Sequence, residues 1–143
     1  MRCIAKFDRR ASPPILKLWI QHAPHRRSDE ATLKVYRYCL VYSCRRAGIL
    51  TPIEDPLYLW VEFIDPTSPD LDNLLTALYR AMDGKSDHLG KHTVLADDKL
   101  IKHVTMGVLE LSTLADHKKD RPLQLPRFTA IRKDELCDTV NVA

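Results

Sequence analysis

The chain lacks the features that would place it in a membrane, outside the cell or among zinc-finger proteins. No stretch approaches the ~20 apolar residues that a membrane-spanning helix needs. The first residues hold no apolar segment of the kind found in secretory signal peptides, so we expect a cytoplasmic protein with no membrane partner. The 4 cysteines form neither a Cys-x-x-Cys pair nor a zinc-ligand spacing, which predicts reduced thiols.

What the chain does have is the composition of an ordinary globular domain. Its 143 residues are 45% hydrophobic and 29% charged, so all of them are expected to form a single domain with a real core. The net charge of +3 hides a segregation: residues 1–50 carry a net +8, and residues 51–83 carry a net −6. Such a pattern suits a metal-dependent nuclease, whose cations hold phosphates and whose carboxylates hold the metal, although a solvated basic surface has the same composition.

Hydrophobic periodicity predicts an α/β (α+β) fold in which a mixed β-sheet packs against two principal helices. The better-marked helix is expected to begin at an N-cap on Ser28 and to end at Gly48. The run 57–64 is apolar on both faces, which predicts a central strand. Strands are expected at residues 4–7, 15–21, 57–64 and 100–111.

The second helix follows Asp70 and carries one apolar stripe at helical spacing. Asp70 stands at the N-cap position, and Asp72 lies in the first turn, where the helix dipole favours an anion. A second acidic pair, Asp97 and Asp98, precedes the strand at 100–111. Two acidic pairs at element boundaries can converge on a hard cation such as Mg²⁺, although capping alone also explains the first pair.

These residues resemble the RusA-type Holliday junction resolvases, a family of crossover junction endodeoxyribonucleases. The resemblance rests on Asp-Leu-Asp-Asn-Leu at 70–74, Ala-Met-Asp-Gly at 81–84 and Leu-Ala-Asp-Asp at 95–98, and it covers about residues 14–111. It implies a homodimeric, Mg²⁺-dependent endonuclease, with Mn²⁺ able to substitute, that cuts four-way DNA junctions in recombination and repair. It also implies that Asp70, Asp72 and Asp98 bind the metal, with Asp97 beside them.

The chain departs from the family pattern at two positions. Thr76 stands where the family usually has a functionally important Lys, and Arg80 stands where it often has an Asp. Arg80 lies one helical turn beyond Thr76, so we expect it to act as a catalytic residue that partly replaces the missing charge. The alternatives are a junction- or duplex-DNA-binding protein with reduced or lost cleavage, and a globular protein with no nucleic-acid role.

Basic residues outside the acidic segment are expected to hold the DNA backbone and to recognise shape more than sequence. They are Arg9, Arg10, Arg26, Arg27, Arg45, Arg46, Lys99 and Lys102. Residues 112–143 form an extension beyond the resemblance, and the sequence assigns them no role.

Overall fold

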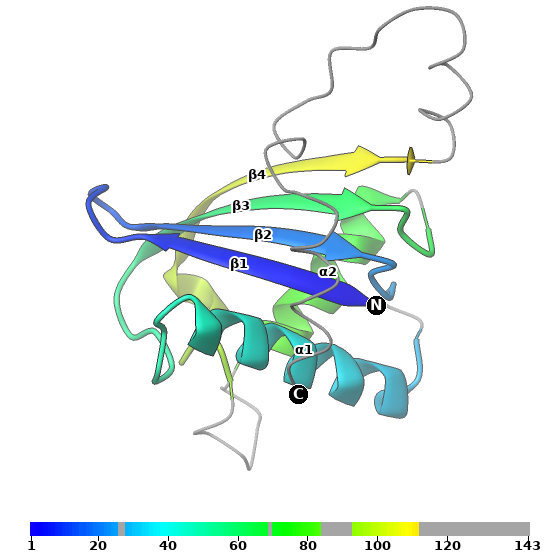
Figure 1. The fold of residues 1–143 in the computed structure, drawn as a ribbon, viewed down its shortest axis with the longest axis horizontal. Helices are drawn as coiled ribbons and strands as arrows, with labels where there is room; N and C mark the ends of the chain where they lie inside the picture. The colour runs from blue at the N-terminus through cyan, green and yellow to red at the C-terminus, as the bar shows by residue number, and fades with distance from the viewer. Residues whose placement is uncertain (26–27, 69, 84–92, 112–143) are drawn as a thin grey trace, which may run out of the picture.

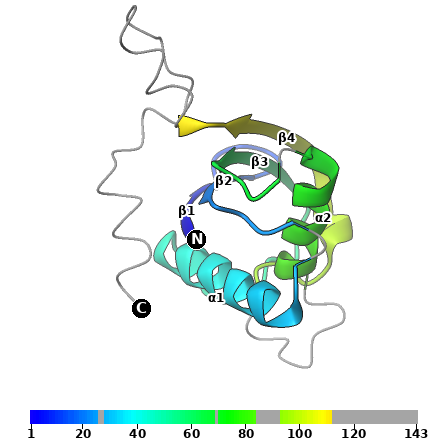
Figure 2. The same cartoon turned by 90° about the vertical axis from the view of Figure 1, so that its right-hand side faces the viewer.

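Four strands form one sheet, and two helices pack against the same face of it, as the two views of the computed structural model show (Figures 1 and 2). The structure describes residues 1–25, 28–68, 70–83 and 93–111. In chain order the elements are β1 (Arg2–Asp8), β2 (Ile15–Gln21), α1 (Glu30–Arg46), β3 (Leu57–Ile64), α2 (Leu71–Met82), the short 3-10 helix η1 (Asp98–Leu100) and β4 (Ile101–Leu109). The predicted α+β fold with a mixed sheet and two principal helices is confirmed.

The direction of the strands gives the sheet two different edges. The strand order is β1-β2-β3-β4; β1 pairs antiparallel with β2, whereas β2, β3 and β4 run parallel. Leu57 lies opposite Ile101 and Ile64 lies opposite Leu109, so β3 and β4 are nearly level. We call the edge where β2, β3 and β4 begin the amino edge, and the edge where they end the carboxyl edge. Parallel neighbours need a crossover, and α1 and α2 provide the two crossovers.

Side chains that alternate between the two faces along each strand explain why both helices pack on one face of the sheet. In β2, Leu16, Leu18 and Ile20 are fully buried in the core that α1 and α2 cover. β3 is a central strand, as predicted, and its Trp60 and Ile64 belong to a second cluster on the opposite face. There Trp60 meets Trp19 edge to face, with ring centroids 5.2 Å apart.

The helix ends follow capping chemistry, with one correction. α1 begins after Asp29 and not after Ser28, because the Asp29 carboxylate accepts a hydrogen bond from the Thr32 amide at 2.7 Å. Hydrogen bonding with the Thr32 side chain, and then with its amide, lowers the pKa of Asp29. The end of α1 is confirmed: Gly48 has φ +92°, a conformation that glycine adopts without steric cost.

Some predictions lie outside the described residues. These are the basic residues Arg26 and Arg27, the C-terminal Gly84 of the second helix, and everything at 112–143. Within the described ranges, neither helix has the length and apolar character needed to cross a membrane.

Candidate functional site

Asp70 caps α2, as predicted from its position. Its Oδ1 accepts hydrogen bonds from the backbone amides of Asp72 at 3.0 Å and Asn73 at 3.4 Å. Its Oδ2 accepts a further bond from the Asn73 side chain at 2.9 Å. Both carboxylate oxygens therefore already serve the start of the helix, although each keeps acceptor capacity toward the exposed side.

The polar face of α2 continues from Asp72 toward the other end of the helix. Asp72 and Thr76 are both exposed, and the Thr76 hydroxyl donates a hydrogen bond to the Asp72 carbonyl oxygen at 2.8 Å. This bond lies within one turn of the helix and occupies the hydroxyl at the position where the family has Lys. Arg80 follows one turn later and is exposed.

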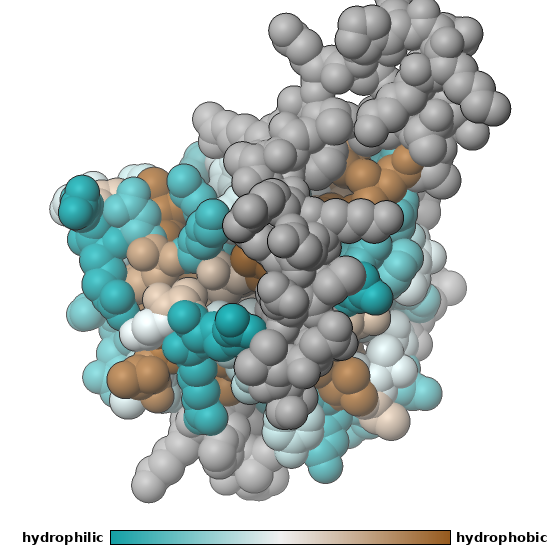
Figure 3. Space-filling model, in the orientation of Figure 1, coloured by the Kyte–Doolittle hydropathy of each residue, from teal (hydrophilic) through white to brown (hydrophobic). Residues whose placement is uncertain are grey.

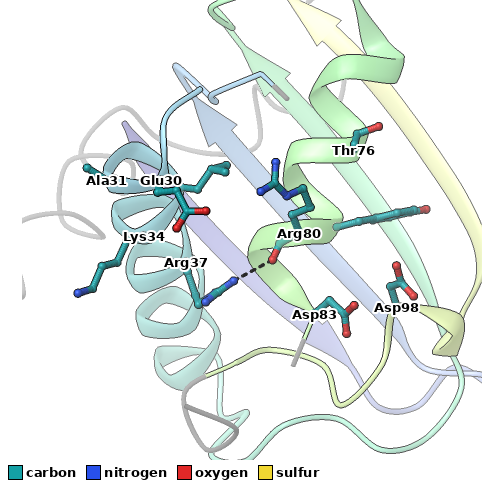
Figure 4. A pocket seen from close by; sticks show the side chains of 10 residues that line it. Glu30, Ala31, Lys34, Arg37, Thr76, Arg80, Asp83 and Asp98 are labelled. Carbon is teal, nitrogen blue, oxygen red and sulfur yellow. Dashed lines mark hydrogen bonds between the residues drawn. The ribbon is translucent and has the colours of Figure 1, made fainter. Parts of the chain in front are cut away.

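A pocket of about 590 Å³ opens between α1 and α2 (Figure 4). Three cationic and three acidic side chains line it, so its charge is mixed and not of one sign. The lining residues are Glu30, Ala31, Leu33, Lys34, Arg37, Thr76, Tyr79, Arg80, Asp83 and Asp98. Figure 4 shows Arg80 extending from α2 toward α1, and Asp83 and Asp98 lying beyond it at the end of α2. The pocket thus brings together Thr76 and Arg80, at which α2 departs from the pattern of the resembling resolvases, and one of the predicted metal ligands.

Arg37 of α1 holds the last turn of α2. Its Nη2 donates to the Arg80 carbonyl oxygen at 3.1 Å, and its Nε donates to the Ala81 carbonyl oxygen at 3.4 Å. Carbonyls at a helix C-terminus lack partners within the helix and carry partial negative charge, so a guanidinium satisfies both needs. The Arg37 contact fixes α1 against α2 and leaves the Arg80 side chain on the pocket side.

Tyr79 lines the pocket, and its surroundings disfavour the ionised form of its hydroxyl. Burial raises the pKa of its hydroxyl, and the nearby negative charge of Asp98 raises it further. The hydroxyl therefore remains protonated at neutral pH and is a donor beside the Asp98 carboxylate. Asp98 itself is half-buried, in η1 immediately before β4.

The two predicted acidic pairs lie at opposite edges of the sheet. Asp70 and Asp72 follow β3 and stand at the carboxyl edge, whereas Asp97 and Asp98 precede the parallel strand β4 and stand at the amino edge. The 12 residues of α2 separate the pairs, which is roughly 18 Å of helix. Within the described ranges, no three His, Cys, Asp or Glu side chains are grouped so as to hold a metal ion. Asp97 instead caps η1, accepting a bond from the Lys99 amide at 3.0 Å.

The predicted DNA-contacting cations that the structure describes gather at the amino edge. The turn after β1 and the end of α1 meet there, because Arg9 donates to the Gly48 carbonyl oxygen at 2.6 Å. Figure 3 shows hydrophilic patches mixed with hydrophobic ones over this end of the molecule. The cations at this edge are Arg9, Arg10, Arg45, Arg46, Lys99 and Lys102, and all six are exposed. Asp98 therefore shares its edge with the basic residues, and Asp70 and Asp72 do not.

Sequence reasoning did not assign Lys34, Arg37, Tyr79 or Asp83 to a site, although all four line the pocket. Glu30, Lys34 and Arg37 recur at helical spacing, which marks one polar stripe on α1. That signal predicts an exposed face, but only the tertiary arrangement shows that this face borders α2. Comparisons of the chain with protein-family models, curated proteins and solved structures found no match.

Proposed function

We propose that this protein is a metal-dependent, structure-selective DNA endonuclease that cuts four-way junctions, as the resemblance to RusA-type resolvases implies. The observation that carries the proposal is the arrangement at the amino edge. The pocket between α1 and α2 brings together Thr76, Arg80 and Asp98 from separate parts of the resembling sequence, and Asp98 stands at the same edge as the six described cations. Cations that hold a DNA backbone would therefore bring a phosphate near this pocket.

Arg80 is suited to interact with that phosphate. It is exposed, it lines the pocket, and its guanidinium makes no hydrogen bond or ion pair with any other described residue. A guanidinium can bind two phosphate oxygens at once, and its charge is retained at any pH compatible with folding. Stabilisation of the negative charge that develops on a phosphate under attack is thus the role that we assign to Arg80.

The carboxylates fit Mg²⁺ only as a pair and not as a four-residue cup within one chain. Mg²⁺ commonly takes one or two carboxylates and completes its shell with waters and substrate phosphates. Asp98 and Asp83 line the same pocket and supply such a pair. Asp70 and Asp72 remain the ligands that the resemblance implies at the other end of α2. When bound, the ion would activate water and stabilise charge on the phosphate.

A homodimer is part of the proposal. A four-way junction has two-fold symmetry, and its resolution requires one cut in each of two strands. A two-fold dimer presents two copies of the same site, which meets that requirement. The dimer and the cytoplasmic location are both inferred from the resemblance and the sequence, and mass measurement in solution tests the first.

Cleavage of a labelled four-way junction in Mg²⁺ or Mn²⁺ tests the function and separates the two ligand pairs. We expect Asp98→Asn and Asp83→Asn to lower single-turnover cleavage about 100-fold or more, with junction affinity in EDTA retained. Asp72→Asn should lower cleavage by as much only if Asp70 and Asp72, the ligands implied by the resemblance, bind the metal. Linear duplex of the same sequence is the control substrate. Wild-type protein that is dimeric and binds the junction, but never nicks it in either metal, would overturn the nuclease proposal.

The second candidate is a junction-binding protein that does not cut. Two observations favour it: the separation of the acidic pairs, and the Thr76 hydroxyl that replaces a cationic side chain and is bonded within its own helix. In that case binding in EDTA and in Mg²⁺ should be equal, and Asp98→Asn should tighten binding by removing a negative charge near the DNA.

A further inference from the structure

The fold gathers three cysteines where α1 lies on β1. Cys3 belongs to β1, and Cys39 and Cys44 belong to α1. Cys3 and Cys44 are buried, whereas Cys39 is partly exposed. The 35 residues between Cys3 and Cys39 hide this cluster from any search for Cys-x-x-Cys spacing.

Cys3 and Cys39 lie beside each other where β1 meets α1. The Ser43 hydroxyl lies 3.1 Å from the Cys3 carbonyl oxygen and 2.7 Å from the Cys39 carbonyl oxygen, so it bridges strand and helix beside the two thiols. The Ser43 bridge therefore holds the backbone of β1 beside that of α1 at these two cysteines, which is the arrangement that a disulfide between strand and helix requires.

The three thiols differ in pKa. The hydrogen bond from Cys3 lowers the pKa of Cys39, because it stabilises the thiolate. Burial raises the pKa of Cys3 well above its usual value, and burial raises the pKa of Cys44 to about 12. Since the thiolate is the reactive species, Cys39 combines the greatest reactivity with the greatest access to solvent.

We propose that Cys39 and Cys3 form a reversible redox site, in which peroxide oxidises Cys39 and Cys3 then closes a disulfide between α1 and β1. In the first step the Cys39 sulfur attacks one oxygen of hydrogen peroxide. An S–O bond forms, the O–O bond breaks, and the hydroxide that leaves takes up a proton as water. In the second step the Cys3 sulfur attacks the sulfenic sulfur of Cys39. The S–S bond forms, the S–O bond breaks, and the hydroxyl leaves with the Cys3 proton as water. Two thiols are oxidised by two electrons, and one peroxide is reduced to two waters.

The test is mass spectrometry of the full-length protein treated with stoichiometric hydrogen peroxide, alkylated and digested without reductant. We expect a peptide pair linked through Cys3 and Cys39 that disappears after dithiothreitol. In the untreated folded protein, iodoacetamide should modify Cys39 at least about tenfold faster than Cys44. Equal alkylation rates for Cys39 and Cys44, or conversion of Cys39 to sulfinic acid without the link, would overturn the proposal.

Matched variants separate the two steps. Cys39→Ser should abolish both the sulfenic acid and the link, whereas Cys3→Ala should abolish the link alone and leave a sulfenic acid on Cys39 that dimedone traps. Cys44→Ala, which alters the third cysteine of the cluster, should still form the link. Thermal unfolding before oxidation establishes that each variant is folded, and if Cys3→Ala is not folded, Cys3→Val takes its place. A link that persists in Cys39→Ser would also contradict the assignment.

Discussion

Asp70 occupies a position that helix capping and metal binding would both explain. Its two oxygens accept three hydrogen bonds at the start of α2, so the capping role needs no metal. Asn caps about as well as Asp, but it lacks the charge that a cation requires. The capping role and the ligand role therefore respond differently to two substitutions of the same residue.

We predict that Asp70→Ala lowers the free energy of unfolding by about 1 kcal/mol, whereas Asp70→Asn changes it by a few tenths. Urea denaturation followed by circular dichroism measures both values. Junction cleavage by the folded Asp70→Asn protein then measures how much the negative charge of Asp70 contributes to activity, apart from its capping role. Wild-type cleavage by that variant would limit Asp70 to its cap, and equal stability of the Ala and Asn variants would contradict the capping role.

Arg80 is the residue to which we assign the charge that Thr76 cannot supply. Arg80→Ala should lower the single-turnover cleavage rate about tenfold or more with little change in junction affinity, because the charge acts on the transition state. Adding Thr76→Lys to that variant should restore activity by returning a cation to the face of α2 where the family has Lys. Lys34→Ala, which removes a cation from the α1 wall of the same pocket, is the matched control. If Arg80→Ala cleaves as fast as the parent protein, Arg80 does not replace the missing charge.

Local sequence patterns predicted where most helices and strands begin and end, but they did not predict which of these elements lie close together. The boundaries of β2 and β3 and the Asp70 cap of α2 agree with the sequence, because alternation, β-branched content and capping act over a few residues. The sequence could not predict whether Asp70 and Asp98 lie close together, because their separation depends on whether β4 runs parallel or antiparallel to β3. Parallel pairing sends the residues before β4 to the edge opposite the residues after β3. Asp83 and Lys34 became pocket residues for the same reason: only the crossing of α1 and α2 brings them together.

Tyr36 tests how α1 packs on the sheet. It is fully buried, and its hydroxyl has no hydrogen-bond partner among the described residues. Burial raises its pKa well above 10.0, the value for an exposed tyrosine. The folded state thus favours the protonated form, so this contribution to stability is complete below pH ~10 and is lost as the pH rises toward the folded-state pKa.

Tyr36→Phe should therefore leave the free energy of unfolding at pH 7 unchanged or raise it by about 1 kcal/mol, because it removes a buried polar group that lacks a partner. Above pH ~10 the variant should lose stability less steeply, by up to about 1.4 kcal/mol per pH unit. Urea denaturation at several pH values measures both effects. Tyr38→Phe is the control, since Tyr38 lies on the same helix and is exposed. A destabilised Tyr36→Phe at pH 7 would mean that the hydroxyl contributes a favourable interaction.

The fold of the whole molecule places the predicted DNA-binding cations and the acidic start of α2 at opposite edges of the sheet. The six described cations of the predicted DNA surface lie at the amino edge, although they come from the turn after β1, the end of α1 and the start of β4. The acidic start of α2 lies at the carboxyl edge. The amino edge also holds acidic residues, among them Asp8, Glu54, Asp55 and Asp98, so its cations are individual contacts for phosphates and not a uniformly positive field.

The salt dependence of binding tests that separation directly. Removing one cation that neutralises a phosphate should reduce the slope of log affinity against log salt by about 0.9, because fewer counterions are released. Arg10→Ala combined with Lys102→Ala removes two exposed cations at the amino edge, so we expect weaker junction and duplex binding and a slope lower by about 2. Arg2→Ala, which removes an exposed cation at the carboxyl edge, is the control and should leave the slope unchanged. If Arg2→Ala changes the slope as much per charge as the double variant does, DNA responds to net charge alone, and the amino edge is not its binding surface.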